Sequence, residues 1–344
     1  MYLNDKKTDK HLYYWLVTMF ILVSSIIIVG GLTRLTDSGL SITEWELFKG
    51  FIPPLSNIEW ENYFSLYKQI PEYKLQNFDM SLEEFKIIFW WEWVHRFLGR
   101  IIGLFFLIPM IYFAFKKGLY ETKSLFFIFF LICFQGFLGW FMVSSGLVNR
   151  VDVSHFRLSL HLVTAFIILS LILWQILNYK YKNKIIENSI KYKLPSIFVL
   201  IVFLQIVFGA FVSGMDAGKI YNTWPLMGNN YFPDDNIITN LFQFAALNDP
   251  SLVQFIHRNL AYLIIFVFLI ILYFVVKGKL LNFYNIIKLL GVALIFQIIL
   301  GVLTILTGAQ MFLASMHQIG SIALISFSVY LLFLNNRKKL TNSF

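Results

Sequence analysis

Histidine is the residue type whose number and spacing in this sequence could do chemistry. The chain has six histidines in 344 residues. Four of them form two pairs at related positions in the two halves of the chain, His95 with His161 and His257 with His317. A single histidine at a membrane interface is usually a hydrogen-bonded or headgroup-facing residue, but polar residues among apolar helices are costly and four matched ones indicate a function. Paired imidazoles from neighbouring helices are the axial ligands that a heme iron takes, so the pattern predicts heme ligation.

Two other kinds of site fit the histidines less well. Zinc normally takes three or four ligands arranged as a tetrahedron, and two histidines in each half are too few. A transporter without a cofactor would place its polar residues near the middle of the membrane, whereas these histidines lie near the predicted outer ends of helices. Of the remaining histidines, His11 lies in the basic N-terminal arm and His155 has no counterpart in the second half. Both are expected to be interface residues.

Arginine and glutamate residues beside the histidines suggest further roles. Each heme carries two propionates, which favour arginine partners, and Arg96 and Arg258 directly follow His95 and His257. Both are predicted to hold propionates, with lipid phosphate or loop carboxylates as the alternative partners. Glu92 precedes His95 by three residues on the same helical face, whereas the matching position before His257 is Gln254.

That difference gives only the first half a carboxylate beside its histidine. Glu92 is expected either to orient a ligand and handle protons, or to pair with Arg96 or Arg100 at the surface.

The elements that must position these residues are membrane helices. The chain is 58% hydrophobic, 19% aromatic and 14% charged, which is more apolar surface than an ordinary soluble core buries. Eight uncharged stretches are long enough to cross the bilayer, and in lipid they must be helices. They run over residues 10–34, 101–115, 124–143, 158–179, 194–215 and 259–276, with two more between 288 and 337 joined by a turn near 307–310. The single cysteine, Cys133, excludes an intramolecular disulfide and is expected to pack inside a helix.

The distribution of charge predicts the orientation. With the N-terminus inside, the inner segments hold 17 of the 28 Lys and Arg and 4 of the 19 Asp and Glu, so the net charge of +9 divides into +13 inside and −4 outside. Both termini are therefore predicted to be cytoplasmic. The positive charge reports topology, and no nucleic-acid partner is expected.

Internal similarity divides the chain into two halves. With an offset of 179, Gly30 and Trp45 fall on Gly209 and Trp224; an offset of 162 matches His95 with His257, and one of 156 matches His161 with His317. Four helices in each half give a parallel repeat. The predicted fold is thus an all-α integral membrane protein of eight transmembrane helices, arranged as two parallel-repeat four-helix bundles over residues 1–180 and 181–344. The long segment between Arg34 and Glu92 is expected to form an outer cap.

Long ordered motifs resemble one family. The sequences GGLTRLTDSGLSITEW (residues 30–45), FIPPL (51–55), PEYK (71–74) and NFDMSLEEFKIIFWWEWVHRFLGRIIG (77–103), with QFIHR (254–258) and SMHQ (315–318), are similar to heme A synthases. The first outer loop lacks the cysteine pair of some members and so resembles the proteobacterial and mitochondrial type.

The resemblance implies an oxidoreductase of the bacterial inner membrane that oxidises a methyl group of heme O to a formyl group, giving heme A for terminal oxidases. It places the substrate heme O between His95 and His161, a heme b that relays electrons between His257 and His317, and the functional glutamate of the family at Glu92. The methyl group would be hydroxylated twice and the diol would lose water. Expected partners are membrane lipid, a heme O synthase, cytochrome oxidase assembly factors and further copies of the chain.

The main alternative function uses the same histidines. A di-heme cytochrome would relay electrons through both sites without modifying either heme. The sequence contains no Asp-rich diphosphate-binding motif, which disfavours the prenyltransferases that form heme O.

Overall fold

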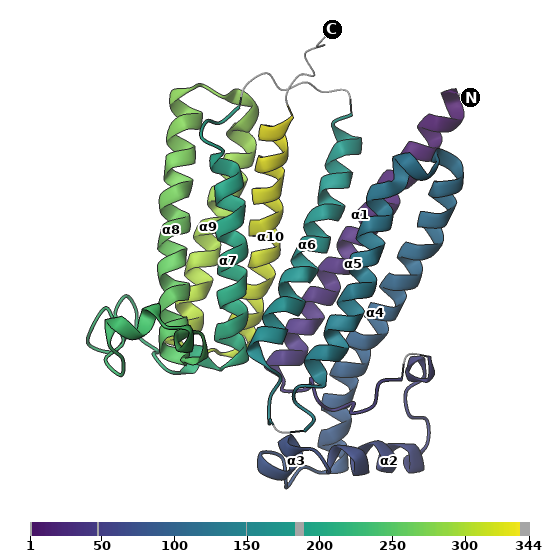
Figure 1. Ribbon diagram of the computed structural model, residues 1–344, viewed down its shortest axis with the longest axis vertical. Coiled ribbons are helices and arrows are strands. Elements are labelled where there is room, and N and C mark those ends of the chain that lie inside the picture. The colour runs from purple at the N-terminus through teal and green to yellow at the C-terminus, as the bar shows by residue number, and fades with distance from the viewer. Residues whose placement is uncertain (1, 47, 149, 183–188, 338–344) are drawn as a thin grey trace. The chain divides into compact units, whose positions relative to one another are not determined.

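The fold is all-α, as predicted. The computed structural model describes residues 2–46, 48–148, 150–182 and 189–337, and side chains from residue 8 onward (Figure 1). Within these residues, eight helices are long and apolar enough to cross a membrane, and no β-strand is present beyond one isolated bridge. They are α1 (Tyr2–Leu35), α4 (Leu82–Lys117), α5 (Leu119–Val143), α6 (His155–Lys180), α7 (Leu194–Gly214), α8 (Pro250–Lys277), α9 (Tyr284–Leu306) and α10 (Met311–Asn336).

The chain folds as two compact units, residues 1–169 and 170–344. The first unit contains α1, α4, α5 and the first half of α6; α1 and α5 both pack against α4. The second contains the rest of α6 with α7 to α10, where α7 packs against α8 and α10, and α9 against α10. The division falls inside α6, whose Trp174 ring packs edge-on against Phe333 of α10. The parallel repeat and the cytoplasmic termini stay predictions.

The helix that carries His95 is much longer than its uncharged stretch. The uncharged stretch of this span begins at Ile101, but α4 begins at Leu82. A capping box explains the difference: the Ser81 side chain accepts from the Glu84 backbone N–H, and the Glu84 side chain accepts from Ser81 N–H. The uncharged stretch does not include the first turns of α4, which contain charged residues, because backbone hydrogen bonds rather than apolar side chains define a helix. One continuous helix therefore carries every candidate residue from 92 to 100.

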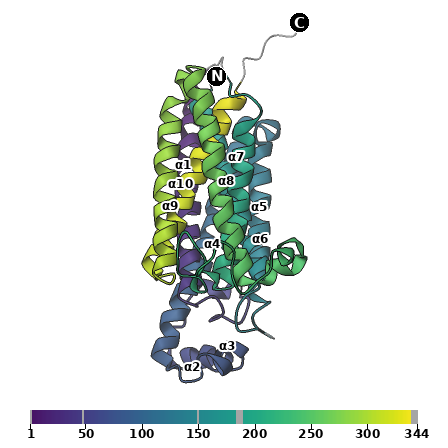
Figure 2. The same ribbon diagram turned by 90° about the vertical axis from the view of Figure 1, so that its left-hand side faces the viewer.

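The segment between α1 and α4 forms a cap over its own aromatic core. It contains η1 (Lys49–Phe51), α2 (Asn57–Tyr67) and α3 (Pro71–Leu75), with the two helices lying beyond the start of α4 (Figures 1 and 2). Phe64 and Tyr67 of α2 pack on Phe85 of α4 with ring centroids 5.0 and 5.2 Å apart. Tyr67 and Phe85 are fully buried. The cap is thus joined to the helix that carries His95 by buried aromatic contacts.

In the second unit, the segment between α7 and α8 is compact and contains three short 3-10 helices, η2 (Ala217–Lys219), η3 (Ile238–Phe242) and η4 (Phe244–Asn248). Asp249 caps α8 by accepting from the Leu252 N–H at 3.0 Å, and Pro250 occupies the first helical position. This cap starts α8 before the uncharged stretch that begins at Asn259.

The turn between α9 and α10 covers residues 307–310, as predicted. Cys133 lies on α5 but is exposed, so the expectation that it packs inside was wrong.

Candidate functional site

The predicted histidine pairs are brought together in both units. His95 of α4 faces His161 of α6 with ring centroids 6.4 Å apart, and His257 of α8 faces His317 of α10 with the same separation. Two imidazoles bound to opposite sides of one iron, each through a bond of about 2 Å, would have their ring centroids about 6 Å apart. The spacing of both pairs therefore fits a single iron between the rings.

A glycine on a neighbouring helix lies against each of the four imidazoles. A Cβ atom added at Gly30 of α1 would lie 3.0 Å from His95 Nε2, and one at Gly139 of α5 would lie 3.2 Å from His161 Cε1. In the second unit the corresponding contacts are Gly209 with His257 at 3.2 Å and Gly301 with His317 at 2.9 Å. Any larger residue would displace the rings, because real Cβ atoms rarely approach so closely. The glycines thus set the position of the histidines.

Glutamine side chains hold the histidine-bearing backbones. Gln135 of α5 and Gln297 of α9 each donate from Nε2, at 2.9 Å, to the backbone carbonyl of His161 and His317 respectively. In addition, Gln205 Nε2 lies 3.2 Å from His257 Nε2. The residue 179 positions before Gln205 is Ile26, so His95 has no equivalent amide contact from that position.

The imidazoles retain open nitrogen atoms. Among the described residues, Nδ1 of His161, His257 and His317 is buried without a hydrogen-bond partner. Buried polar atoms are almost always satisfied, so such nitrogens indicate a ligand. No group of three or more His, Cys, Asp or Glu residues converges within the described part of the chain, which disfavours zinc. The donor set therefore fits a heme better than a protein-ligated metal ion.

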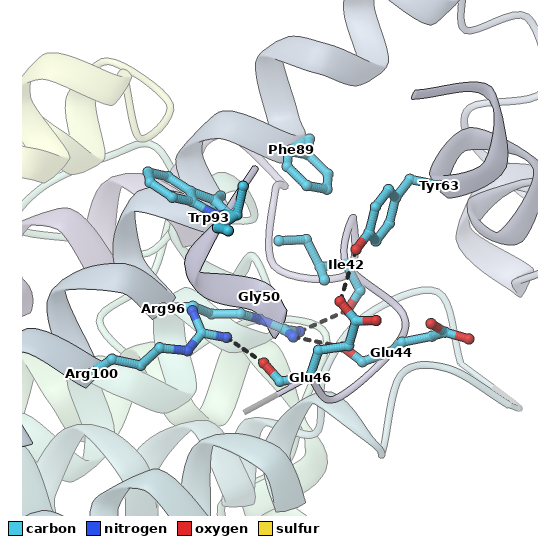
Figure 3. A pocket seen from close by; sticks show the side chains of 10 residues that line it. Ile42, Glu44, Glu46, Gly50, Tyr63, Phe89, Trp93, Arg96 and Arg100 are labelled. Carbon is cyan, nitrogen blue, oxygen red and sulfur yellow. Dashed lines mark hydrogen bonds between the residues drawn. The ribbon is translucent and has the colours of Figure 1, made fainter. Parts of the chain in front are cut away.

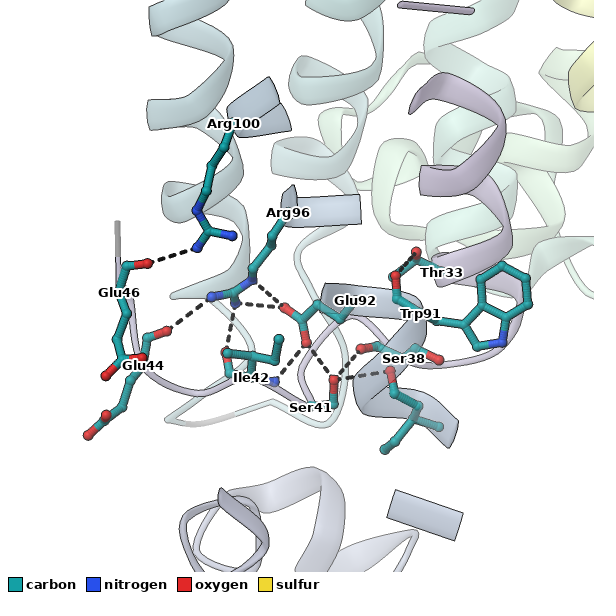
Figure 4. A network of polar contacts seen from close by, with 11 residues as sticks. Thr33, Ser38, Ser41, Ile42, Glu44, Glu46, Trp91, Glu92, Arg96 and Arg100 are labelled. Atoms are coloured by element: carbon teal, nitrogen blue, oxygen red, sulfur yellow. Dashed lines mark hydrogen bonds and ion pairs between the residues drawn. The ribbon is translucent and has the colours of Figure 1, made fainter. Parts of the chain in front are cut away.

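Glu92 of α4 is buried and accepts four hydrogen bonds (Figure 4). Its Oε2 accepts from Ser41 Oγ at 2.7 Å and from Ile42 N–H at 2.7 Å. Its Oε1 accepts from Arg96 Nε at 3.0 Å and Nη2 at 2.6 Å. A two-pronged arginine contact combined with a backbone N–H is a strong, geometrically specific arrangement. The expected pairing of Glu92 with Arg96 is thus present, but it is buried rather than at the surface.

Arginines of α4 bind the loop that follows α1 through its backbone. Arg96 donates to the carbonyls of Ile42 at 2.7 Å and Glu44 at 3.0 Å, and Arg100 donates to that of Glu46 at 2.8 Å. These carbonyls belong to alternate residues, so residues 42–46 lie extended along one face of α4. We call residues 38–46 the strap. It fixes Glu92 and both arginines in one network.

The second unit repeats the arginine contacts without the carboxylate. Arg258 donates to the carbonyls of Tyr221 and Thr223, both at 2.9 Å, and these two residues lie 179 positions after Ile42 and Glu44. Gln254 donates to the Tyr221 carbonyl at 3.1 Å. Among the described residues, Arg258 Nε has no hydrogen-bond partner, which leaves a buried donor for an anion. The predicted propionate role of Arg96 and Arg258 stays a prediction, and both also hold loops.

A small pocket lies between the strap, the cap and α4 (Figure 3). Tyr63 of α2 donates to Glu46 at 2.8 Å inside it. Burial, followed by the hydrogen bond to Glu46, raises the pKa of Tyr63 to about 12. Burial acts to raise the pKa of Glu46, but hydrogen bonds from Tyr63 and Lys49 outweigh it and lower that pKa overall. The full lining is Ile42, Glu44, Glu46, Gly50, Ile52, Tyr63, Phe89, Trp93, Arg96 and Arg100.

The sequence alone missed two kinds of contact. The offset of 179 pairs Gly30 with Gly209, and that of 162 pairs Gly139 with Gly301 and Gln135 with Gln297, yet nothing in the sequence showed that these residues contact the histidines. Ser41 had no signal of its own, because its contact with Glu92 spans 51 residues. His155, expected at an interface, is buried at the first turn of α6 and packs on Phe156.

Fold and site together define a polytopic membrane protein with two paired-histidine sites of equal spacing, one of which includes a buried carboxylate network. The family model COX15-CtaA, described as cytochrome oxidase assembly protein, matches residues 13–329. The chain belongs to this family.

Three relatives are similar over almost their whole length. A heme A synthase of Pelagibacter ubique is 49% identical over 342 residues, which cover 98% of this chain and 100% of the relative. One of Rickettsia bellii is 45% identical over 94% of this chain and 97% of its own, and one of Rickettsia felis is 41% identical over 93% and 96%. The predicted family is confirmed.

Proposed function

We propose that this protein makes heme A by oxidising a methyl group of heme O to a formyl group, for use by terminal oxidases. The observation that carries the proposal is the difference between the two histidine pairs. Both have an iron-compatible spacing of 6.4 Å, but only His95 and His161 lie beside a buried carboxylate network. The relatives named heme A synthase, at up to 49% identity over nearly the full chain, support the same reaction.

We assign the substrate to the first unit and the cofactor to the second. Heme O would bind between His95 and His161, beside Glu92. A heme b held by His257 and His317 would supply one-electron transfer when bound. The amide contact of Gln205 on His257, which has no counterpart at Ile26, fits a permanently held group in the second unit.

The residues of the first unit position the substrate. His95 and His161 would hold its iron, and Gly30 and Gly139 fix the planes of their rings. Glu92 fixes Arg96, whose guanidinium also donates to the strap carbonyls of Ile42 and Glu44. Arg96 would hold a propionate by exchanging one of these acceptors for the carboxylate of the heme. Ser41, hydrogen-bonded to Glu92, offers a hydroxyl through which a proton can move.

The eight candidate spans and the bacterial relatives support a multi-pass membrane protein. The cytoplasmic membrane of a bacterium is the proposed location, because heme A serves oxidases there. A heme O synthase, oxidase assembly factors and further copies of the chain are proposed partners.

A direct test separates this function from the di-heme cytochrome. The chain is expressed in cells that produce heme O but no heme A, and the extracted hemes are separated by chromatography. A synthase yields heme A or its hydroxylated precursor, whereas an electron-transfer cytochrome leaves only heme O and heme b. A protein purified without any heme would contradict both functions and favour the transporter.

A further inference from the structure

The cap contains a buried carboxyl group that the site described above does not use. Glu72 lies on α3, within the PEYK motif, and is only 4% exposed. Its Oε2 is buried without a hydrogen-bond partner among the described residues. The apolar core of the cap includes Tyr67, whose hydroxyl hydrogen-bonds the Glu72 carboxyl, and Ile70, which lies two residues before Glu72 in the chain. An ionised carboxylate in such a place would be strongly disfavoured, so the geometry favours a protonated Glu72.

The charged groups around Glu72 strengthen this preference. Burial is the main cause that raises the pKa of Glu72 to about 8, followed by the negative charges of Glu92 on α4, Asp152 before α6 and Asp37 after α1, while the Tyr67 hydroxyl of α2 acts weakly in the other direction. Arg34 lies in the last turn of α1. Its Nη1 forms an ion pair with Asp37 Oδ1 at 2.6 Å and lies 3.9 Å from Asp152 Oδ1.

Arg96, the cation beside Glu92, is bound to Glu92 itself. On α3 itself, Lys74 is exposed and Tyr73 packs against Tyr67. The three carboxylates that raise the pKa of Glu72 thus come from separate segments of the first unit: the loop after α1, helix α4 and the loop before α6.

Three hydroxyl side chains lie along the loop that leads from the end of α1 to Glu92. Ser41 Oγ donates to Glu92 and lies 3.0 Å from the Ser38 carbonyl oxygen, and Ser38 Oγ pairs with Thr36 Oγ1 at 2.7 Å. Ser38 and Ser41 are buried, whereas the neighbouring Asp37 is exposed. Glu92, which Ser41 contacts, and Asp37, which lies between Thr36 and Ser38 in the sequence, are both carboxylates whose charge acts on Glu72.

We propose that Glu72 holds an exchangeable proton and acts, through Glu92, as a positioning residue for proton transfer between the histidine site of the first unit and the side of the membrane on which the cap lies. This inference rests on the proposed function, since oxidation of a methyl group to a formyl group moves protons as well as electrons. No bond other than that to the proton changes at Glu72. The second unit has a shorter connection between α7 and α8 and Gln254 in place of Glu92, which fits a proton route needed on the substrate side only.

Infrared spectroscopy tests the proton directly and needs no turnover. The purified full chain is compared between about pH 6, where an ordinary glutamate is ionised but Glu72 is protonated, and about pH 9, where both are ionised. The wild type should lose a protonated-carboxyl stretching band as the pH passes about 8. The band should be absent from Glu72→Gln and unchanged in Glu61→Gln, the same substitution at an exposed site on α2. Persistence of the whole band in Glu72→Gln would overturn the proposal.

The pH profile of heme A formation tests the use of the proton. Membranes containing each variant receive heme O at a series of pH values. Glu72→Gln, which cannot exchange a proton, should slow formation by about tenfold or more and remove the inflection near pH 8. Equal heme binding by Glu72→Gln and Glu61→Gln establishes that the variant is folded. A rate and pH profile equal to those of Glu61→Gln would refute the role.

The two arms separate the possible failures. If the wild type forms no heme A, the proposed function and this use of the proton are both wrong. The infrared band still reports whether Glu72 holds a proton. If heme A forms and Glu72→Gln has no effect, the proposed function is supported and the role of Glu72 in proton transfer is contradicted.

Discussion

Glu92 is tied to its surroundings by donors from three different groups: the Ser41 hydroxyl, the Ile42 N–H and the Arg96 guanidinium. This arrangement makes the residue a structural centre as well as a candidate for chemistry. A carboxylate accepts all of these bonds at once, whereas an amide would direct two N–H groups at one or two of the donors. The role of Glu92 in holding the strap can therefore be tested together with its role in the reaction.

Glu92→Gln should lower heme A formation by about tenfold or more, because the amide replaces one of the two oxygens that accept from the strap and Arg96 with an N–H donor. The measurement is the heme A to heme O ratio in cells that supply heme O. Glu44→Gln is the control, since Glu44 is exposed and contributes its carbonyl rather than its side chain to Arg96. Unchanged heme A production in Glu92→Gln would contradict both roles.

The glycine beside His161 allows a paired test on one helix. In Gly139→Ala the new Cβ would lie 3.2 Å from His161 Cε1, whereas in Gly136→Ala nothing lies within 4 Å. Both changes favour helix formation by about 1 kcal/mol, so a difference between them reports the contact alone. Gly139→Ala should lose heme from the first unit, seen as lower low-spin absorbance of the purified protein. Equal heme content in the two variants would show that the ring is free to move.

At the scale of elements, the cap and α4 act together through their aromatic core. The raised pKa of Glu72, about 8, makes the stability of this contact depend on pH. Between the unfolded value of about 4.3 and the folded value, the folded cap binds more protons than the unfolded chain. Its free energy of unfolding must therefore fall as the pH rises through this window, and level off above it.

This dependence predicts that a protease cleaves the cap faster at about pH 8 than at about pH 5, after correction for the activity of the protease itself. Glu72→Gln should remove the difference, because its side chain does not titrate. Glu61→Gln should keep it. A cap whose cleavage is equally pH-dependent in Glu72→Gln would mean that another group is responsible.

At the scale of the whole molecule, each histidine pair lies within one compact unit, so the two sites are expected to lose heme independently. His317→Ala should remove the heme b that we propose for the second unit and leave the first unit able to bind heme O, whereas His161→Ala should do the reverse. Heme extraction and quantitation of each purified variant measure both. Loss of both hemes from either variant would contradict independent sites.

The sequence predicted the eight helices and both histidine pairs, because hydrophobic length and repeated spacing are local signals. It misplaced the starts of α4 and α8, where capping by Ser81 and Asp249 extends helices past charged residues. It could not show that Gly30 lies on His95 or that Ser41 reaches Glu92, since those contacts depend on how helices pack. The burial of Glu72 depends in the same way on the aromatic core of the cap.

The arginine contacts to the strap have a consequence for how this protein tolerates change. Arg96 binds the carbonyls of Ile42 and Glu44, and Arg258 binds those of Tyr221 and Thr223 at the matching positions. The molecule thus makes one contact twice with unrelated side chains. Residue 44 is exposed, so a spectroscopic probe attached there would leave the carbonyl contact in place and report, by its mobility, when substrate loosens the strap.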